Sequence, residues 1–248
     1  MKKAILLLIG VMVVAPVFSQ QDENRDTIDH DTKEHFIRWK GKTVKTRWVM
    51  LELGISGMDT KEPYTLENGA DPFEIRYIKS TNVNLHLIQQ KIRIIKNHLN
   101  FIYGLTFEFH KYFFDNPVVL EPDDPKVNFT YIENANFDKN RLNYTYLTVP
   151  VMINIESNPG HLCRSFHFSA GVFGGPLIGA NFKTKNGEKN KEKDNFNLSK
   201  WRYGIRSEIG YGLITFYGTV ALNELFQEEK NNGYVVTPYS LGLIIVPF

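Results

Sequence analysis

Apolar and polar side chains alternate along most of the chain after Arg47, and this is the period of a β-strand whose two faces meet different surroundings. The clearest segment is LNFIYGLTFEFHKY, residues 99–112, with aromatic and aliphatic residues on one face and mostly polar residues on the other. Strands of soluble proteins usually end after about five or six residues, whereas a strand that spans a membrane needs about 9–11. The length of this alternation therefore predicts a membrane-spanning strand.

The same pattern recurs and predicts eight strands. The second of them changes register between its two apolar pairs, Leu85 with Leu87 and Ile92 with Ile94. The predicted strands cover residues 47–57, 83–96, 99–112, 141–155, 164–180, 201–212, 214–222 and 234–248. An even number of antiparallel strands is typical of a single-chain bacterial barrel. The sequence thus predicts an all-β fold, an eight-stranded antiparallel up-and-down transmembrane β-barrel.

Charged residues on these strands indicate which side of the sheet faces lipid. A soluble eight-stranded barrel fills its interior with apolar side chains and carries its charges outside. Here the apolar face is uniformly aromatic and aliphatic, and the polar face is rich in Gly, Ser, Thr, Arg and Glu, which favours lipid outside and a packed polar lumen. Buried charges need partners, so we predict a lumen charge network. Its members are Glu52, Glu108, Arg202, Arg206 and Glu208. A soluble lipocalin-like barrel is the alternative.

The predicted connections alternate in length. Asn97-His98 and Leu213 leave tight turns. The long connections are polar and cover residues 57–82, 113–140, 181–200 and 224–233, the third of which contains a solvated charge run at 185–195. If the N-terminus is periplasmic, all four long connections lie on the extracellular side, as expected for an outer-membrane barrel.

The N-terminal segment has the features of an export signal. Lys2 and Lys3 precede an apolar run from Ala4 to Ala15, which is too short for a transmembrane helix of about 20 residues. We predict a signal peptide at residues 1–20, with an uncleaved N-terminal anchor as the alternative. Residues 21–46 are highly charged and predict a flexible periplasmic extension, with a poorly ordered lead-in to the first strand as the alternative. The barrel domain is then expected at residues 47–248.

Composition narrows the chemistry. The formal net charge is +2, which indicates no nucleic-acid partner, and the single cysteine, Cys163, excludes an internal disulfide. No metal-ligand spacing or nucleotide fingerprint is present, so no metal or other cofactor is predicted. The chain ends in LGLIIVPF, and its terminal Phe248 resembles the signal that bacterial barrel-insertion machinery recognises.

Four segments resemble the PorT-like outer-membrane β-barrel proteins common in Bacteroidetes. They are RWVMLELGISGM (47–58), YLTVPVMINIES (146–157), FHFSAGVFGGPLIGA (166–180) and DNFNLSKWRYGIRSEIGYG (194–212). The resemblance runs through most of the chain after about residue 44. It implies an eight-stranded barrel in the outer membrane of a Gram-negative bacterium, but it implies no reaction. PorT itself is associated with the type IX secretion machinery, so a secretion-machinery or other envelope protein partner is one expectation.

One pair of residues raises an enzymatic alternative. His167 and Ser169 form an H-x-S motif similar to that of the PagL-type lipid A deacylases, in which a His activates a Ser nucleophile and an acid orients the ring. Glu208 would be the acid if it lay adjacent across the strands. In those enzymes the site faces lipid, whereas here both residues fall on the polar, inward face.

The sequence therefore predicts a non-enzymatic outer-membrane barrel with a structural, adhesive or secretion-associated role. It would act through its extracellular loops or a partner, surrounded by outer-membrane lipid and lipopolysaccharide. A lipid A deacylase-type hydrolase is the alternative.

Overall fold

The computed structural model describes residues 44–95, 98–122, 124–133, 137–158 and 164–245. The predicted signal peptide, residues 21–43 of the predicted extension, Cys163 and Phe248 lie outside these residues. No helix in the described part of the chain is long and apolar enough to cross a membrane. The strands are β1 (Val44–Thr60), β2 (Thr81–Ile95), β3 (Leu99–Phe113), β4 (Val118–Leu120), β5 (Phe129–Tyr131), β6 (Lys139–Glu156), β7 (Phe166–Asn186), β8 (Glu188–Glu192), β9 (Trp201–Tyr211), β10 (Ile214–Ala221) and β11 (Val236–Ile245).

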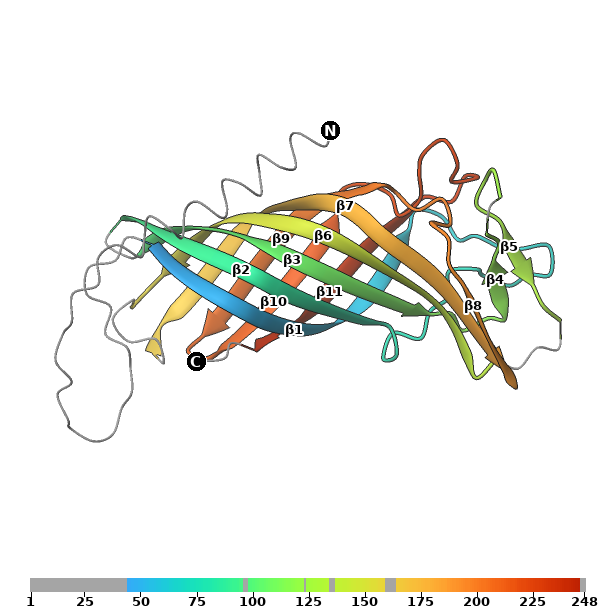
Figure 1. Cartoon of the computed structure of the whole chain (residues 1–248), viewed down its shortest axis with the longest axis horizontal. Coiled ribbons are helices and arrows are strands. Elements are labelled where there is room, and N and C mark those ends of the chain that lie inside the picture. The colour runs from blue at the N-terminus through green and yellow to red at the C-terminus, as the bar shows by residue number, and fades with distance from the viewer. Residues whose placement is uncertain (1–43, 96–97, 123, 134–136, 159–163, 246–248) are drawn as a thin grey trace.

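Eight of these described strands close into a ring. Hydrogen bonds join them in the order β6-β3-β2-β1-β11-β10-β9-β7, and β6 pairs with β7 to complete the circle. Every pairing is antiparallel, and β1 and β11, the first and last strands along the chain, lie side by side (Figure 1). The predicted eight-stranded up-and-down barrel is confirmed.

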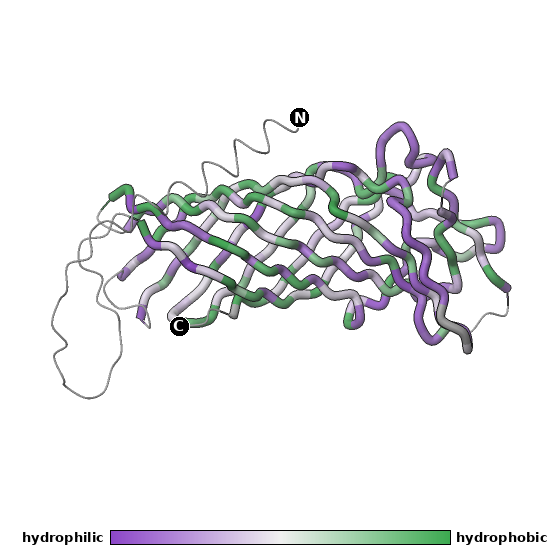
Figure 2. The backbone as a smooth tube through the Cα atoms, in the orientation of Figure 1, coloured by the Kyte–Doolittle hydropathy of each residue, from purple (hydrophilic) through white to green (hydrophobic). Residues whose placement is uncertain are grey.

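The two faces of the ring differ sharply in chemistry. On β9, every outward residue is exposed and, apart from Ser207, apolar or aromatic, and each residue between them is buried. Figure 2 shows this alternation of green and purple along the strands. The same outward apolar face continues around the ring and includes Trp48, Leu53, Ile153, Phe168, Val172, Trp201, Tyr203, Ile209, Phe216, Val220 and Leu243. Such a band is stable only against lipid, so the wall of the barrel is its membrane-facing surface.

Glycine lets neighbouring strands approach closely at inward positions of the ring. A Cβ atom added at Gly175 would collide with the backbone oxygen of Leu147, and one at Gly204 would collide with that of Val220. Both positions belong to the inward-facing set of their strands. The small residues of the polar face thus allow the sheet to curl into a narrow cylinder.

The structure confirms the register change predicted in the second strand and shows additional strands within two of the predicted connections. The register of β2 against β3 shifts between His86 and Ile88, within the predicted segment. In contrast, residues 181–200 are not simply a polar loop, because β7 continues to Asn186 and pairs with β8. Residues 113–140 likewise contain the β4–β5 hairpin. Both additions lie at the end of the barrel opposite to the tight turn at Leu213 (Figure 1).

Candidate functional site

The interior of the barrel, as far as the described residues define it, has three layers along the axis. A small polar cavity lies at the end with the tight turns, ion pairs occupy the middle, and an apolar cluster covers the end with the long connections. Long connections face the outside of the cell in outer-membrane barrels, so the apolar cluster is extracellular and the cavity periplasmic.

Arg206 is the centre of the first ionic group. Its Nη2 atom lies 2.5 Å from Glu52 Oε1 and 2.8 Å from Glu208 Oε1, and its Nε donates to Glu208 Oε1 at 2.9 Å. Asn84 Nδ2 donates to the second Glu52 oxygen at 2.8 Å, and His86 Nε2 lies 2.6 Å from the first. These groups are buried, and removal of a charge from water is costly unless it is paired. Removal of any one charged side chain of this group would therefore leave a buried charge without its partner.

Arg202 organises the second group, nearer the extracellular end. It forms an ion pair with Glu108, and its Nη1 lies 3.1 Å from His110 Nε2. Thr148 Oγ1 donates to the other Glu108 oxygen at 2.8 Å. The guanidinium also lies over the ring of Phe173, 4.8 Å from its centroid. Arg202 is only 2% exposed, so this arrangement fills the lumen instead of lining an open channel.

The structure places all five sequence-predicted charged residues inside the barrel, in these two groups. Sequence reasoning missed the polar residues that complete the groups. They are Asn84, His86, His110 and Thr148. Each of them falls on the inward positions of β2, β3 or β6, so the alternation itself was the signal that could have found them.

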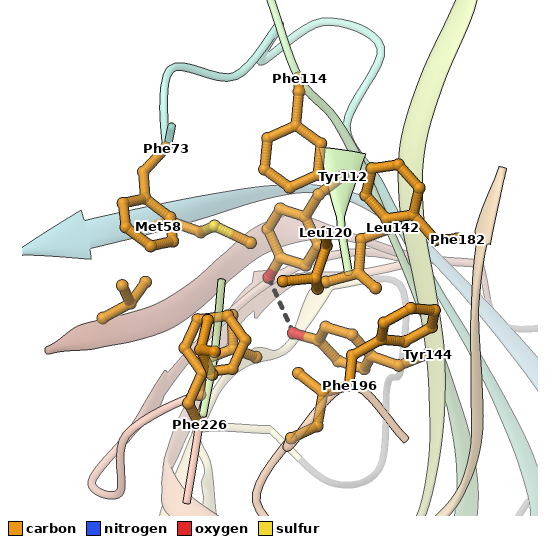
Figure 3. Packing of buried hydrophobic residues seen from close by; sticks show 14 of the residues in the cluster. Met58, Phe73, Tyr112, Phe114, Leu120, Leu142, Tyr144, Phe182, Phe196 and Phe226 are labelled. Atoms are coloured by element: carbon orange, nitrogen blue, oxygen red, sulfur yellow. Dashed lines mark hydrogen bonds between the residues drawn. The ribbon is translucent and has the colours of Figure 1, made fainter. Parts of the chain in front are cut away.

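The extracellular end is closed by a buried apolar cluster that we call the cap. Inward residues from the ends of the strands meet residues from the four long connections and from the β4–β5 hairpin (Figure 3). Phe73 makes edge contacts with Phe129 and Tyr234 at ring-centroid distances of 5.1 and 5.3 Å. The members of the cap are Met58, Phe73, Ile75, Tyr112, Phe114, Val118, Leu120, Val127, Phe129, Leu142, Tyr144, Tyr146, Phe182, Phe196, Leu198, Leu225, Phe226 and Val236.

Hydrogen bonds fasten the connections of the cap to one another. Asn140 Nδ2 donates to the carbonyl of Val118 at 2.7 Å, and Ser199 Oγ donates to the carbonyl of Glu224 at 2.7 Å. The backbone N–H of Val127 donates to the carbonyl of Lys230 at 2.8 Å. Burial of one large apolar side chain is worth about 1.5–3 kcal/mol, so the cap is a folded unit with its own core.

The interpretation of these connections as polar loops is therefore wrong. The signal was present in short apolar pairs spaced by two residues, such as Phe73 with Ile75 and Phe196 with Leu198. Tyr112 and Tyr144, whose hydroxyls are 3.2 Å apart, join the cap to the ionic layer below (Figure 3). The interior is thus packed continuously from the ion pairs to the outer end.

The periplasmic cavity holds the residues of the enzymatic alternative. Its volume is about 90 Å³, and His167, Ser169 and Glu208 all line it. Ser169 lies opposite Glu208 across β7 and β9, but its hydroxyl accepts a hydrogen bond from Asn154 at 3.1 Å. His167 Nε2 lies 2.7 Å from the hydroxyl of Thr215 instead. Within the described residues no hydrogen bond joins His167 to Ser169.

The cavity is lined mostly by polar and charged side chains. Lys91 forms an ion pair with Glu156 at the cavity wall. The described chain contains no group of three or more His, Cys, Asp or Glu residues that could hold a metal ion. His167 and Ser169 thus lie in a polar interior cavity, away from the lipid-facing wall.

Comparison with known proteins agrees with a membrane barrel. The chain matches no curated protein. Two solved structures similar to it are those of Ail, the attachment invasion locus protein of Yersinia pestis, one of them in complex with the heparin analogue sucrose octasulfate. Both are 13% identical and cover 79% of this chain and 94% of Ail, with TM-scores of 0.33 for the complex and 0.32 for Ail alone. A family model matches residues 35–227, and the chain belongs to the family described as the outer membrane protein beta-barrel domain.

Proposed function

We propose that this outer-membrane protein is a non-enzymatic barrel that works through its extracellular cap, in adhesion or in a secretion-associated complex with an envelope protein partner. The observation that carries the proposal is the cap itself, in which all the long connections pack into one apolar core. Loops that serve only as links do not need such a core. A folded cap presents a fixed outer surface, and a fixed surface is suited to binding.

The filled lumen supports the same proposal, because it is inconsistent with transport of solutes through the barrel. Eight strands leave an interior just wide enough for side chains. Here that interior holds two buried arginines with their carboxylate partners and, above them, the apolar cluster. A solute would have to break these ion pairs to pass.

We further propose that the chain is a PorT-like protein of Bacteroidetes, exported by a signal peptide at residues 1–20 and continuing through a periplasmic extension. The four segments quoted above support the resemblance. On this proposal the partner belongs to the secretion machinery.

The experiment that tests the proposed function is deletion of the gene in the bacterium that encodes it, with export of secreted proteins and attachment to surfaces as readouts. Complementation with the wild-type gene should restore whichever readout falls. Unaltered export and unaltered attachment in the deletion strain would contradict the proposal.

The Ser169→Ala variant separates this function from the hydrolase alternative. Because Ser169 bonds to Asn154 and not to His167, we expect the variant to complement the deletion fully and to leave the acylation of lipid A unchanged. Mass spectrometry of extracted lipid A measures the second readout. Loss of a deacylated lipid A species in the variant alone would establish the hydrolase instead.

A further inference from the structure

A basic face lies on the outer side of the sheet where it passes beyond the apolar band. Arg141, Lys183 and Lys191 are successive cross-strand partners on β6, β7 and β8. Lys139 and Lys185 occupy the next row outward. Neighbouring strands are about 4.8 Å apart and alternate residues about 6.8 Å, so these five cationic positions share a small area.

Strand pairing separates the charges of the run at 185–195 into two faces. Lys189 and Lys191 lie opposite lysines of β7, whereas Glu192 lies opposite Phe182. Phe182 is buried in the cap, so the residues on either side of it belong to the outer face. The run is nearly neutral in sequence, but strand pairing places Lys185 and Lys191 on the outer face and Glu192 on the opposite face.

The basic face is not neutralised within the described chain. Four cations, namely Arg141, Lys191, Lys111 and Lys139, act electrostatically on Lys183. The acidic group at this face is Asp138, which pairs with Lys185 at 2.6 Å. The Arg141 guanidinium lies over the ring of Phe113, 5.3 Å from its centroid, and its Nε has no hydrogen-bond partner. Cations held this close together favour an anionic ligand.

An apolar groove lies on the same outer wall, directly on the membrane side of the basic face. Leu85, Phe107, Phe109 and Ile178 line it, and Lys193 is at its margin. Its volume is about 570 Å³. The groove follows a bulge, because the register of β6 against β7 shifts after Thr145. Gly179 also lines the groove, and a Cβ added there would meet no atom within 4 Å.

From this juxtaposition we propose a lipid site on the outer wall of the barrel. Its ligand is a phosphorylated, acylated glycolipid of the outer leaflet, namely the lipid A part of lipopolysaccharide. An acyl chain lies in the groove, and the phosphates contact Arg141, Lys183 and Lys191. Lys111 is two residues beyond Phe109 on the same face of β3, so the basic face begins where the apolar wall ends, at the depth of lipid headgroups.

Binding of lipid A to the full-length protein in detergent micelles tests the site, with native mass spectrometry as the readout. The charge variant is Arg141→Glu with Lys183→Glu, and its matched control is Lys61→Glu with Lys126→Glu, two exposed lysines elsewhere. The groove variant is Gly179→Leu. Its control is Gly218→Leu on the β10 wall, where a Cβ would meet only side-chain atoms of Leu241 and Ser207.

We expect the charge variant to weaken binding of bisphosphorylated lipid A by about tenfold or more, since each cation near an anionic surface contributes measurably. The groove variant should also weaken it, and neither control should change it. Lipid A without phosphates should bind the wild type as weakly as bisphosphorylated lipid A binds the charge variant. Heat-dependent gel mobility checks that each variant forms the barrel.

Two outcomes would overturn the site. One is equal binding of bisphosphorylated lipid A to folded charge variant and wild type. The other is tight binding of a soluble polyanion, tested with sucrose octasulfate, together with lipid A binding that does not depend on the groove. In that case Gly179→Leu would change the binding of neither ligand. That second result would make the basic face a polysaccharide surface instead.

Discussion

The Arg206→Met variant is expected to lose about 3–5 kcal/mol of unfolding free energy, because the substitution leaves buried carboxylates without their cation. Glu52 and Glu208 both pair with Arg206, and all three are buried. The cost comes from the unpaired acids and not from lost packing, since Met fills much of the same space. Urea unfolding in lipid vesicles, followed by tryptophan fluorescence, measures the change.

Two further variants identify the cause. Arg76→Ala removes an arginine from an ion pair with Asp115 in which both side chains are well exposed, so its cost should be about 0–1 kcal/mol. Combination of Arg206→Met with Glu52→Leu and Glu208→Leu should recover part of the lost stability, because no ion is then left alone. A triple variant that is less stable than Arg206→Met alone would contradict this explanation.

The Phe129→Ala variant is expected to open the cap and leave the barrel intact. Phe129 is buried and contacts the rings of Phe73 and Tyr234, and loss of such a side chain costs about 3–5 kcal/mol. Local opening should therefore become at least about a hundredfold more frequent, since each 1.4 kcal/mol is a factor of ten. Limited proteolysis of the 113–140 connection in intact vesicles measures the rate.

The matched control for the cap is Ile78→Ala. Ile78 lies in the first long connection but is 93% exposed, so its removal should leave the cleavage rate unchanged. Heat-dependent gel mobility should be the same for both variants and the wild type. Equal cleavage of Phe129→Ala and wild type would mean that the connections do not depend on a shared core.

The strands could be predicted because each one carries its own signal. On β9 the charged Arg202, Arg206 and Glu208 alternate with aromatic and aliphatic neighbours, so both the strand and its inward face follow from local order. The hydrogen-bond and ion-pair partners of each charged residue were harder to predict from the sequence. His86 and His110 join the ion pairs through cross-strand register, and register depends on the whole ring.

The cap could not be predicted in the same way. Its contacts join Phe73, Phe129 and Phe226, which belong to three different connections and share no periodicity. Strand β8 was missed for another reason. A run rich in Lys and Glu is compatible with a solvated loop and with an edge strand, and the pairing with β7 distinguishes them.

Measurement of ion conductance by the purified wild-type protein in planar bilayers tests the central claim, that the ion pairs and the cap block the lumen from its middle to its outer end. We predict insertion without any stable conducting state in concentrated KCl. A reproducible open channel of one size, present in wild type at low voltage, would contradict a filled interior and with it the assignment of function to the outer end.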